Sequence, residues 1–420
     1  MNRQFFIFFF LLLSFRLSAQ QEPITLTLKD AEQRFQEHNL SLIAGHYNID
    51  MARAQVIQAK LFENPVISFE QNVYNSFNGK LFYVGKQGDY NASIEQVISI
   101  AGQRNQRIKL EKANLKISEY QFGEVLRTLH SELNNTFAEL YFSSKSLEVY
   151  DKEISSLEKL LQVMKEQQGK GNVSLMESSR IEALLFSLRK ERNEAEDSVH
   201  SLRGELNVLL SLPPQQEVKL LFDESILKKV DLSSLSYSTL QSQLLERPDI
   251  KLANAQIDAA RVNLKLQKAL AYPSVSLKGS YDKNGSFMKD YFGVGFSVSV
   301  PVFNRNQGNI KSARLDAEQN TIEKNAAEEK ANAELYTAYT RLQKSLELYK
   351  QSNEALERDF GQLITGVNDN FRKRNISMPE FIDYYESYKN VCLQLYETRK
   401  NVLLAMENLN TVTGHTLFSY

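Results

Sequence analysis

Few residues in this sequence have the types and spacing that chemistry at a site requires. The five histidines are scattered along the chain: His38, His46, His130, His200 and His415. Neither they nor the single cysteine, Cys392, show the spacing of a metal site, and no glycine-rich phosphate-binding loop is present. We therefore expect no enzyme activity, no cofactor and no metal site, and we interpret Cys392 as a small buried apolar residue.

Three carboxylates at the starts of helical segments are the candidate functional side chains. Glu380 and Asp383 are three residues apart, so both lie on one face of a helix, and Glu177 occupies the position that matches Glu380 in an earlier segment. In a symmetric oligomer each acid would form a ring, and acidic rings at a narrow pore favour cations. The alternative is that they are ordinary first-turn acids, stabilised by the helix dipole.

The acids belong to an internal repeat. Arg104-Asn105-Gln106 recurs as Arg305-Asn306-Gln307, and the segment 171–177 recurs as 374–380, at displacements of 201 and 203 residues. The two landmarks are 68 residues apart in the first copy, from Arg104 to Asn172, and 70 apart in the second, from Arg305 to Asn375. This nearly constant separation suggests that the length of the segment matters.

That segment has the apolar spacing of a long helix. Steps of four and three residues, a 3.5-residue period, predict coiled-coil helices over 104–168 and 305–372. Shorter amphipathic stretches at 29–62, 176–210, 240–272 and 378–412 each have about half that length. Two half-length helices placed end to end could flank one long helix.

Four segments change to a period of two, which predicts strands over 65–75, 90–100, 273–281 and 291–301. The alternation is clearest in Phe292, Val294, Phe296, Val298 and Val300, which we expect to face lipid. Each segment is about as long as a tilted outer-membrane strand. Four strands cannot close a barrel, so several chains must each contribute four. The alternative is a pair of soluble hairpins on a helical protein.

The N-terminus and the composition limit where such a protein acts. A basic Arg3, an apolar run and a small-residue site after Ala19 predict a signal peptide at 1–19, with a short membrane anchor as the alternative. No comparable apolar stretch follows. The formal net charge of −1 provides no basic surface for nucleic acid.

The order of elements in the two repeats, the Asn64-Pro65 entry to the first strand and the Gly-x-x-Ser-x-x-Glu turn at 171–177 resemble the TolC-like outer membrane efflux proteins. The resemblance implies a mainly α fold with a small β part. It implies a homotrimer with a 12-strand β-barrel in the lipid of the cell outer membrane, continuous with a periplasmic α-helical tunnel. A periplasmic adaptor (membrane fusion) protein and an inner-membrane efflux pump would hand over substrates for passive conduction. The short connector resembles the heavy-metal-resistance branch.

The resemblance also implies two kinds of site. Glu177, Glu380 and Asp383 would line the tunnel constriction, although Pro379 precedes Glu380 and Arg374 stands where the first copy has Gly171. Ser174 and Ser377 are predicted N-caps, each three residues before a glutamate. The residues expected to contact the adaptor at the tips are Gly171, Val173, Ser174, Leu175, Ser377 and Met378.

The predicted organisation has two structural repeats after the signal peptide. The first repeat is 20–238, with a tip turn at 169–175 and a connector at 211–238, and the second is 239–420, with a tip turn at 373–377. Two alternatives need long helices without such matched repeats. One is a periplasmic coiled-coil adaptor or scaffold without a membrane barrel, and the other is a surface adhesin or filament.

Overall fold

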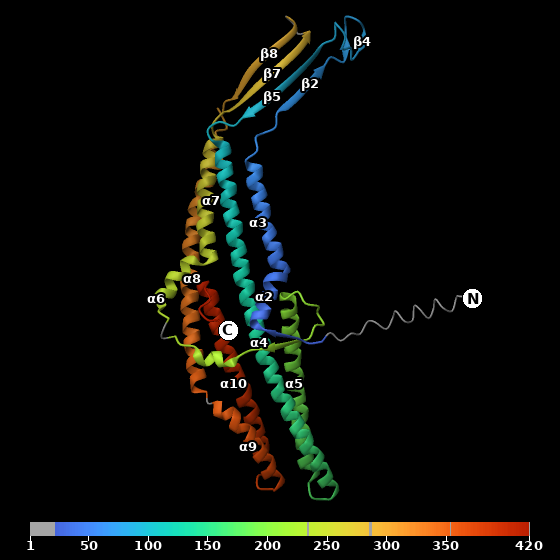
Figure 1. The fold of residues 1–420 in the computed structure, drawn as a ribbon, viewed down its shortest axis with the longest axis vertical. Coiled ribbons are helices and arrows are strands. Elements are labelled where there is room, and N and C mark those ends of the chain that lie inside the picture. The colour runs from blue at the N-terminus through green and yellow to red at the C-terminus, as the bar shows by residue number, and fades with distance from the viewer. Residues whose placement is uncertain (1–21, 233–234, 285–287, 353, 420) are drawn as a thin grey trace, which may run out of the picture. The chain divides into compact units, whose positions relative to one another are not determined.

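The computed structural model describes residues 22–232, 235–284, 288–352 and 354–419 (Figure 1). The signal peptide expected at 1–19 lies outside the described residues. The fold is mainly helical with a small β part, as predicted. The helices are α2 (Leu28–His38), α3 (Leu40–Ala59), α4 (Gln103–Gly169), α5 (Leu175–Leu209), α6 (Tyr237–Gln243), α7 (Pro248–Leu270), α8 (Gln307–Gln351), α9 (Glu354–Arg372) and α10 (Met378–Thr413). The strands are β1 (Ile24–Thr27), β2 (Val66–Gln71), β3 (Tyr74–Asn75), β4 (Lys80–Leu81), β5 (Tyr90–Ile98), β6 (Val218–Leu221), β7 (Ser274–Asn284) and β8 (Lys289–Ser299).

The chain forms two compact units, and both predicted repeats contribute to each of them. Of the residues that the structure describes, those within 22–43, 125–244 and 331–419 form one unit, and those within 44–124 and 245–330 form the other. The first unit holds the helix-hairpin tips, and the second holds the four-stranded sheet. The repeats are therefore not separate compact bodies.

The two long helices differ in continuity. The first, α4, is unbroken over 67 residues where the sequence predicts a helix over 104–168. The single helix predicted over 305–372 is instead divided into α8 and α9. The Ser352 hydroxyl donates a 2.6 Å hydrogen bond to the Tyr349 carbonyl, and the Ser352 amide donates to the carbonyls of both Leu348 and Tyr349. Such competition by a serine side chain for backbone acceptors bends or ends helices.

The first predicted short helix, 29–62, is also two helices. Asn39 has extended backbone angles and ends α2, while its Oδ1 accepts a 3.0 Å hydrogen bond from the Leu42 amide and so caps α3. Its Nδ2 donates to the Leu209 carbonyl at 2.9 Å. The break therefore fastens the start of the first repeat to the end of α5.

The helix predicted over 240–272 is likewise interrupted. It begins as α6, continues as a 3₁₀ turn at Leu244–Glu246, and restarts as α7 with Pro248 in its first turn. Proline cannot continue a preceding helix, because it lacks an amide hydrogen and its ring clashes with the turn before it, but it suits the first turn of a new one.

The connector contains secondary structure that ties it to the N-terminal segment. Strand β6 pairs in parallel with β1, with Leu26 opposite Leu220, and a 3₁₀ helix follows at Glu224–Lys229. The β1 strand has no counterpart among the predicted strands. Because it precedes α2 directly, this pair sets where the first repeat begins.

The four longest strands form one antiparallel sheet in the order β2-β5-β7-β8 (Figure 1). The register pairs Ile67 with Ile94 and Leu277 with Phe296. Because directly paired residues point to the same side of a sheet, this register decides the composition of each face. In the part of the chain that the structure describes, none of the helices combines the length and apolar character that crossing a bilayer requires.

Candidate functional site

The two faces of the sheet differ sharply in polarity. One face is largely apolar and carries Ile67, Phe69, Ala92, Ile94, Ile98, Val275, Leu277, Tyr281, Phe292, Val294, Phe296 and Val298. The opposite face carries mostly Gly, Ser and charged residues, among them Ser68, Glu70, Ser93, Glu95, Ser276, Lys278, Ser280, Gly293, Gly295 and Ser297. The apolar side chains of β8 are exposed in the single chain, with Val294 94% accessible. The sheet therefore presents one face suited to lipid and one suited to water.

An aromatic row crosses the apolar face toward the loops that join the strands. It takes one ring from each strand: Phe69, Tyr90, Tyr281 and Phe292, with successive ring centroids 5.8, 5.9 and 4.8 Å apart. Aromatic girdles mark the membrane interface in outer-membrane proteins. The row thus has the composition and place of such a girdle.

The two tip turns share one backbone geometry. In the first, the Gly171 amide donates to the Gln168 carbonyl and the Asn172 amide to the Gln167 carbonyl. In the second, Arg374 and Asn375 donate in the same way to the carbonyls three and five residues before them. These paired bonds are a Schellman motif, which needs a left-handed residue, and here Gly171 has φ +77° and Arg374 has φ +58°.

Arg374 also connects the two turns. Its guanidinium donates a hydrogen bond to the carbonyl of Asn172. A non-glycine residue in the left-handed region costs about 1–2 kcal/mol, and this cross-turn bond offsets part of that cost. Arg374, which stands in the second turn where the first turn has Gly171, therefore links the two tips.

Both predicted capping boxes are confirmed. The Ser174 hydroxyl accepts from the Glu177 amide at 3.2 Å, and the Glu177 carboxylate accepts from the Ser174 amide at 2.8 Å. Ser377 and Glu380 repeat this arrangement at the start of α10. Hydrogen bonds from the backbone and hydroxyl of Ser174 lower the pKa of Glu177, and bonds from the hydroxyl and backbone of Ser377 lower that of Glu380.

Two of the three predicted gate acids, Glu177 and Glu380, therefore have a capping function in the single chain. Glu177 and Glu380 stay ionised because their caps favour the charged form, whereas Asp383 is exposed one turn further along α10. This is the first-turn role that the sequence left open as the alternative. It does not decide whether the same carboxylates line a constriction, which stays a prediction.

The residues predicted for adaptor contact divide into exposed and buried groups. Leu175 is 69% exposed, while Met378 is only 7% exposed and Val173 is partly buried against the same apolar cluster. Met176, which the sequence analysis did not select, is 70% exposed beside Leu175. The surface of the first tip is therefore apolar at Leu175 and Met176, whereas Met378, the first residue of α10 in the second tip, is buried in the core that both hairpins share.

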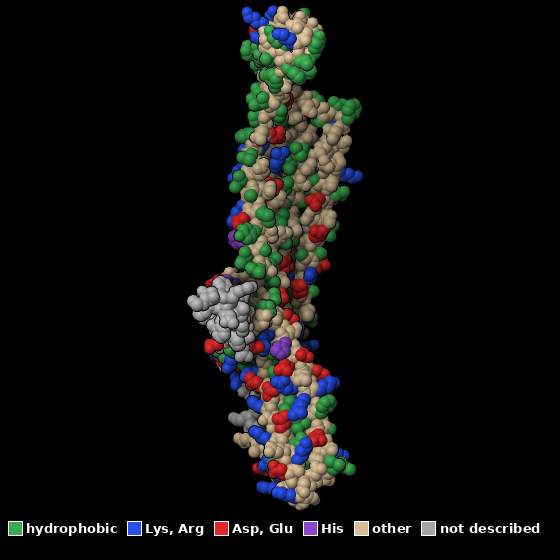
Figure 2. Space-filling view, turned by 90° about the vertical axis from the view of Figure 1, so that its right-hand side faces the viewer, with side chains coloured by type: hydrophobic (Ala, Val, Ile, Leu, Met, Phe, Trp, Pro, Cys, Tyr) green, Lys and Arg blue, Asp and Glu red, His purple; other side chains and the backbone are tan. Residues whose placement is uncertain are grey.

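An apolar core joins α4, α5, α9 and α10 behind the tips. It includes Leu157, Ile181, Val367, Phe381 and Tyr385. Inside it, the Tyr385 hydroxyl donates to Asn368 Oδ1 at 2.9 Å, which leaves Ser156 as the donor in the 2.8 Å bond between their hydroxyls. Figure 2 shows basic and acidic side chains interspersed over the surface of this four-helix tip, at the lower end of the view.

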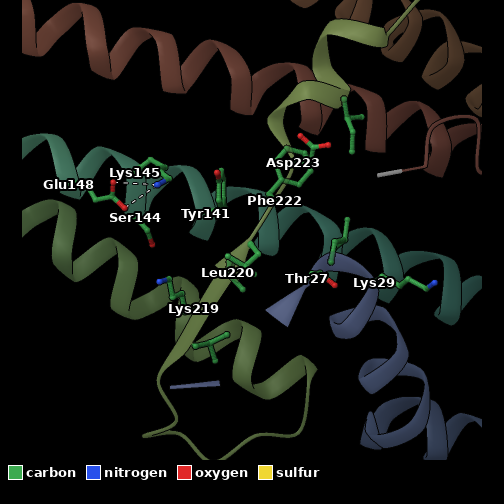
Figure 3. Close-up of a pocket in the computed structure, with 14 residues that line it drawn as sticks. Thr27, Lys29, Tyr141, Ser144, Lys145, Glu148, Lys219, Leu220, Phe222 and Asp223 are labelled. Atoms are coloured by element: carbon green, nitrogen blue, oxygen red, sulfur yellow. Dashed lines mark hydrogen bonds and ion pairs between the residues drawn. The ribbon is translucent and has the colours of Figure 1, made fainter. Parts of the chain in front are cut away.

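A cavity of about 600 Å³ lies where the connector crosses α4 (Figure 3). Its wall includes Tyr141 and Lys145 of α4 and Phe222 of the connector. The Tyr141 hydroxyl donates to Glu224 at 3.0 Å, and burial together with the Glu224 charge raises the pKa of Tyr141, which therefore remains a donor. Lys145 pairs with Glu148 at 3.1 Å. The Tyr141–Glu224 bond holds the connector on the surface of α4, whereas the Lys145–Glu148 pair lies within α4.

Together, these features define a class of protein in which two helix-hairpin repeats carry a short, two-faced antiparallel sheet. The model of the family described as outer membrane efflux proteins matches residues 32–211 and 239–363. The chain belongs to the outer membrane efflux protein family.

Individual relatives have low sequence identity to this chain, whereas a solved structure matches its fold over most of its length. The chain is 24% identical over 241 residues to the pyoverdine export outer membrane protein OpmQ of Pseudomonas aeruginosa, covering 56% of this chain and 45% of that protein. It is 27% identical over 198 residues to the cation efflux system protein CusC of Escherichia coli, covering 44% and 40%. The chain thus spans less than half the length of these two relatives. The CmeC outer membrane channel of Campylobacter jejuni matches its fold with a TM-score of 0.77 and 16% identity, covering 92% of this chain and 85% of that one.

Removing one cap tests whether the capping box holds the second tip together. Ser377→Ala should destabilise the first turn of α10 by about 1 kcal/mol, because the Glu380 amide loses its acceptor. Amide hydrogen exchange in that turn should become about fivefold faster. The exposed Ser387 lies further along α10, so Ser387→Ala is the matched control and should leave exchange there unchanged. Equal exchange in both variants would contradict the capping role.

Proposed function

We propose that this protein is the outer-membrane channel component of a tripartite export system. It would passively conduct small molecules that an inner-membrane pump and a periplasmic adaptor hand over, with no enzymatic step of its own. The observation that carries this proposal is the combination of a sheet with one apolar and one polar face and paired helix hairpins that end in matched turns. Membership of the outer membrane efflux family supports it.

The free edges of the sheet support assembly into a homotrimer. Strands β2 and β8 are the edge strands, so each has one side without a partner in the single chain. Open strand edges are not tolerated in lipid, because unpaired backbone groups there have no water to bind. Three chains would supply twelve strands and pair every edge, with the apolar faces toward the lipid and the polar faces toward a water-filled interior.

The tips would contact the adaptor. A trimer would present six turns, and the two turns of each chain have the same Schellman geometry and the same capping box. The exposed apolar side chains of Leu175 and Met176 are the contact that we propose for the first turn, with Gly171, Ser174 and Ser377 providing the rigid backbone. Val173 and Met378 would act from within the core.

Glu177, Glu380 and Asp383 would form the constriction. Threefold symmetry would turn each carboxylate into a ring, and the lowered pKa of Glu177 and Glu380 would keep these rings charged. Capping and gating are compatible, because a cap uses only part of the acceptor capacity of a carboxylate.

The alternative function, an adaptor or scaffold without membrane strands, has less support. It would not require a sheet with two faces of opposite polarity, and the CmeC structure, which has a similar fold, is that of an outer membrane channel. Membrane fractionation tests the choice: the detergent-extracted protein should come from the outer membrane and have the size of a trimer. A soluble monomer after signal removal would contradict the proposal.

A charge on the apolar face should impair insertion. Phe296→Arg should cost about 2–4 kcal/mol if the residue lies near the bilayer midplane, because a guanidinium replaces an apolar group in lipid. The measurement is the yield of outer-membrane, heat-resistant trimer. Ser297→Arg introduces the same charge on the opposite face and is the control, since a water-facing arginine should leave trimer yield nearly intact. Similar losses in both variants would argue against the assignment of faces.

Neutralising the gate acids should weaken cation selectivity. In Glu380→Gln combined with Asp383→Asn, glutamine still accepts the hydrogen bonds of the capping box, so α10 should keep its start. The readout is the cation-to-anion permeability ratio of the reconstituted channel, which should fall. Glu397→Gln removes an exposed charge much further along α10, away from the tip, and should not change the ratio. An unchanged ratio in the double variant would refute the gate assignment.

The tip contact can be tested apart from the cap. Leu175→Glu combined with Met176→Gln should abolish cross-linking to the adaptor and export, because a charge and an amide replace the exposed apolar pair. Trimer yield and heat stability should stay near native, since neither side chain is buried. Lys190→Gln, on an exposed part of α5 away from the turn, is the control. Export that survives the double variant would show that the tips are only helix caps.

A further inference from the structure

Glu153 is a carboxyl group buried inside the four-helix tip. It lies on α4 and is 3% exposed, and its Oε1 has no hydrogen-bond partner in the structure. A buried ionised carboxylate with one oxygen unsatisfied is unfavourable in an apolar setting, whereas the protonated group is far less so. Its position in the core therefore favours the neutral form.

The charged groups around Glu153 do not compensate for its burial. Lys389 of α10 acts on it favourably, but the Lys389 ammonium is bonded to Glu191 of α5 at 2.7 Å, and Glu191 itself repels a charged Glu153. Burial is the largest influence and raises the pKa of Glu153 to about 8. The favourable charge of Lys389 therefore offsets only part of the effect of burial on Glu153.

Glu153 also lies near the polar contacts that join the two hairpins. One turn further along α4, Ser156 bonds the Tyr385 hydroxyl of α10, which in turn bonds Asn368 of α9. Burial raises the pKa of Tyr385, the charge of Glu153 adds to this rise, and Arg372 of α9 opposes it. Burial also raises the pKa of Tyr150 on α4, with smaller contributions from the charges of Glu191 and Glu153. The titratable and charged groups that interact with Glu153 thus come from α4, α5 and α10.

We propose that Glu153 makes the packing of α10 in the tip sensitive to protons. While Glu153 is protonated, α10 stays packed against α4 and α5. When Glu153 ionises, the tip shifts toward an arrangement in which α10 separates and the carboxylate reaches water. The consequence for transport rests on the proposed function, since it requires the tip to be the periplasmic mouth of a channel, but the packing change does not.

The direction of the pH dependence follows from the raised pKa. The packed tip binds a proton that the separated tip releases at its ordinary pKa of 4.5. The packed arrangement is therefore fully favoured below that value, loses stability as the pH rises from there to about 8, and changes no further above it. Because one proton is involved, the equilibrium shifts by at most about tenfold per pH unit.

The chain contains its own reporter for this change. Cys392 is the single cysteine of the sequence, lies on α10 three residues after Lys389, and is buried. A thiol reagent reaches it only when α10 separates from its neighbours. Its labelling rate in the detergent-solubilised full-length protein therefore measures the separated state.

The experiment compares Cys392 labelling by a maleimide in the native protein and in Glu153→Gln across pH. The ratio of the two rates removes the titration of the thiol itself, and it should rise at least about tenfold between about pH 5.5 and about pH 8. Glu158→Gln changes an exposed glutamate on the same helix and should follow the native profile. Glu153→Met, a second neutral side chain of similar length, should behave as Glu153→Gln does.

A ratio that stays constant over this range overturns the proposal. If neither variant folds, the native protein alone still tests the proposal. Its Cys392 labelling rate, divided by the labelling rate of a cysteine peptide at the same pH, should rise with pH. A ratio that does not change with pH refutes the inference. Conductance measured over the same range separates the two proposals. pH-dependent labelling without conductance counts against the channel function only, and conductance with pH-independent labelling counts against the role of Glu153 only.

Discussion

The register of four antiparallel strands is the constraint on which the rest of this structure depends. Each strand alternates in polarity, but only the pairing of Ile67 with Ile94 and of Leu277 with Phe296 collects the apolar residues on one side. A slip of one residue in any strand would move its apolar set to the opposite face. The helices must therefore position the four strands in one register, with little variation.

Hydrogen bonds at the ends of the helices help to meet this constraint. Gln103, at the start of α4, donates to the Ala269 carbonyl near the end of α7, and Asn306, before α8, donates to the Gln267 carbonyl. Both bonds join the exit of a strand hairpin to the last turn of α7, which follows α4 in the chain and precedes α8. The repeated Arg-Asn-Gln segments lie at these junctions, which explains why the repeat is clearest there.

Local signals in the sequence predict much of this architecture, and long-range contacts account for most of what they miss. A capping box such as Ser174 with Glu177 and the alternation along β8 involve neighbours in the chain, so both can be read without a structure. The end of α2 at Asn39 depends on a carbonyl 170 residues away, and the charges that act on Glu153 of α4 come from α5 and α10. The sequence shows that Arg374 stands where the first copy has Gly171, but it does not predict the hydrogen bond from Arg374 to Asn172.

The interruption at Ser352 makes the two hairpins mechanically unequal. A helix with a continuous hydrogen-bond ladder resists bending, and one whose carbonyls are shared with a side chain bends at lower cost. Within the tip unit, α4 continues unbroken to its turn, whereas α9 begins directly after the break. The first hairpin is therefore stiff, and the second can bend at the break between α8 and α9. Displacement at the tips then falls mainly on α9 and α10.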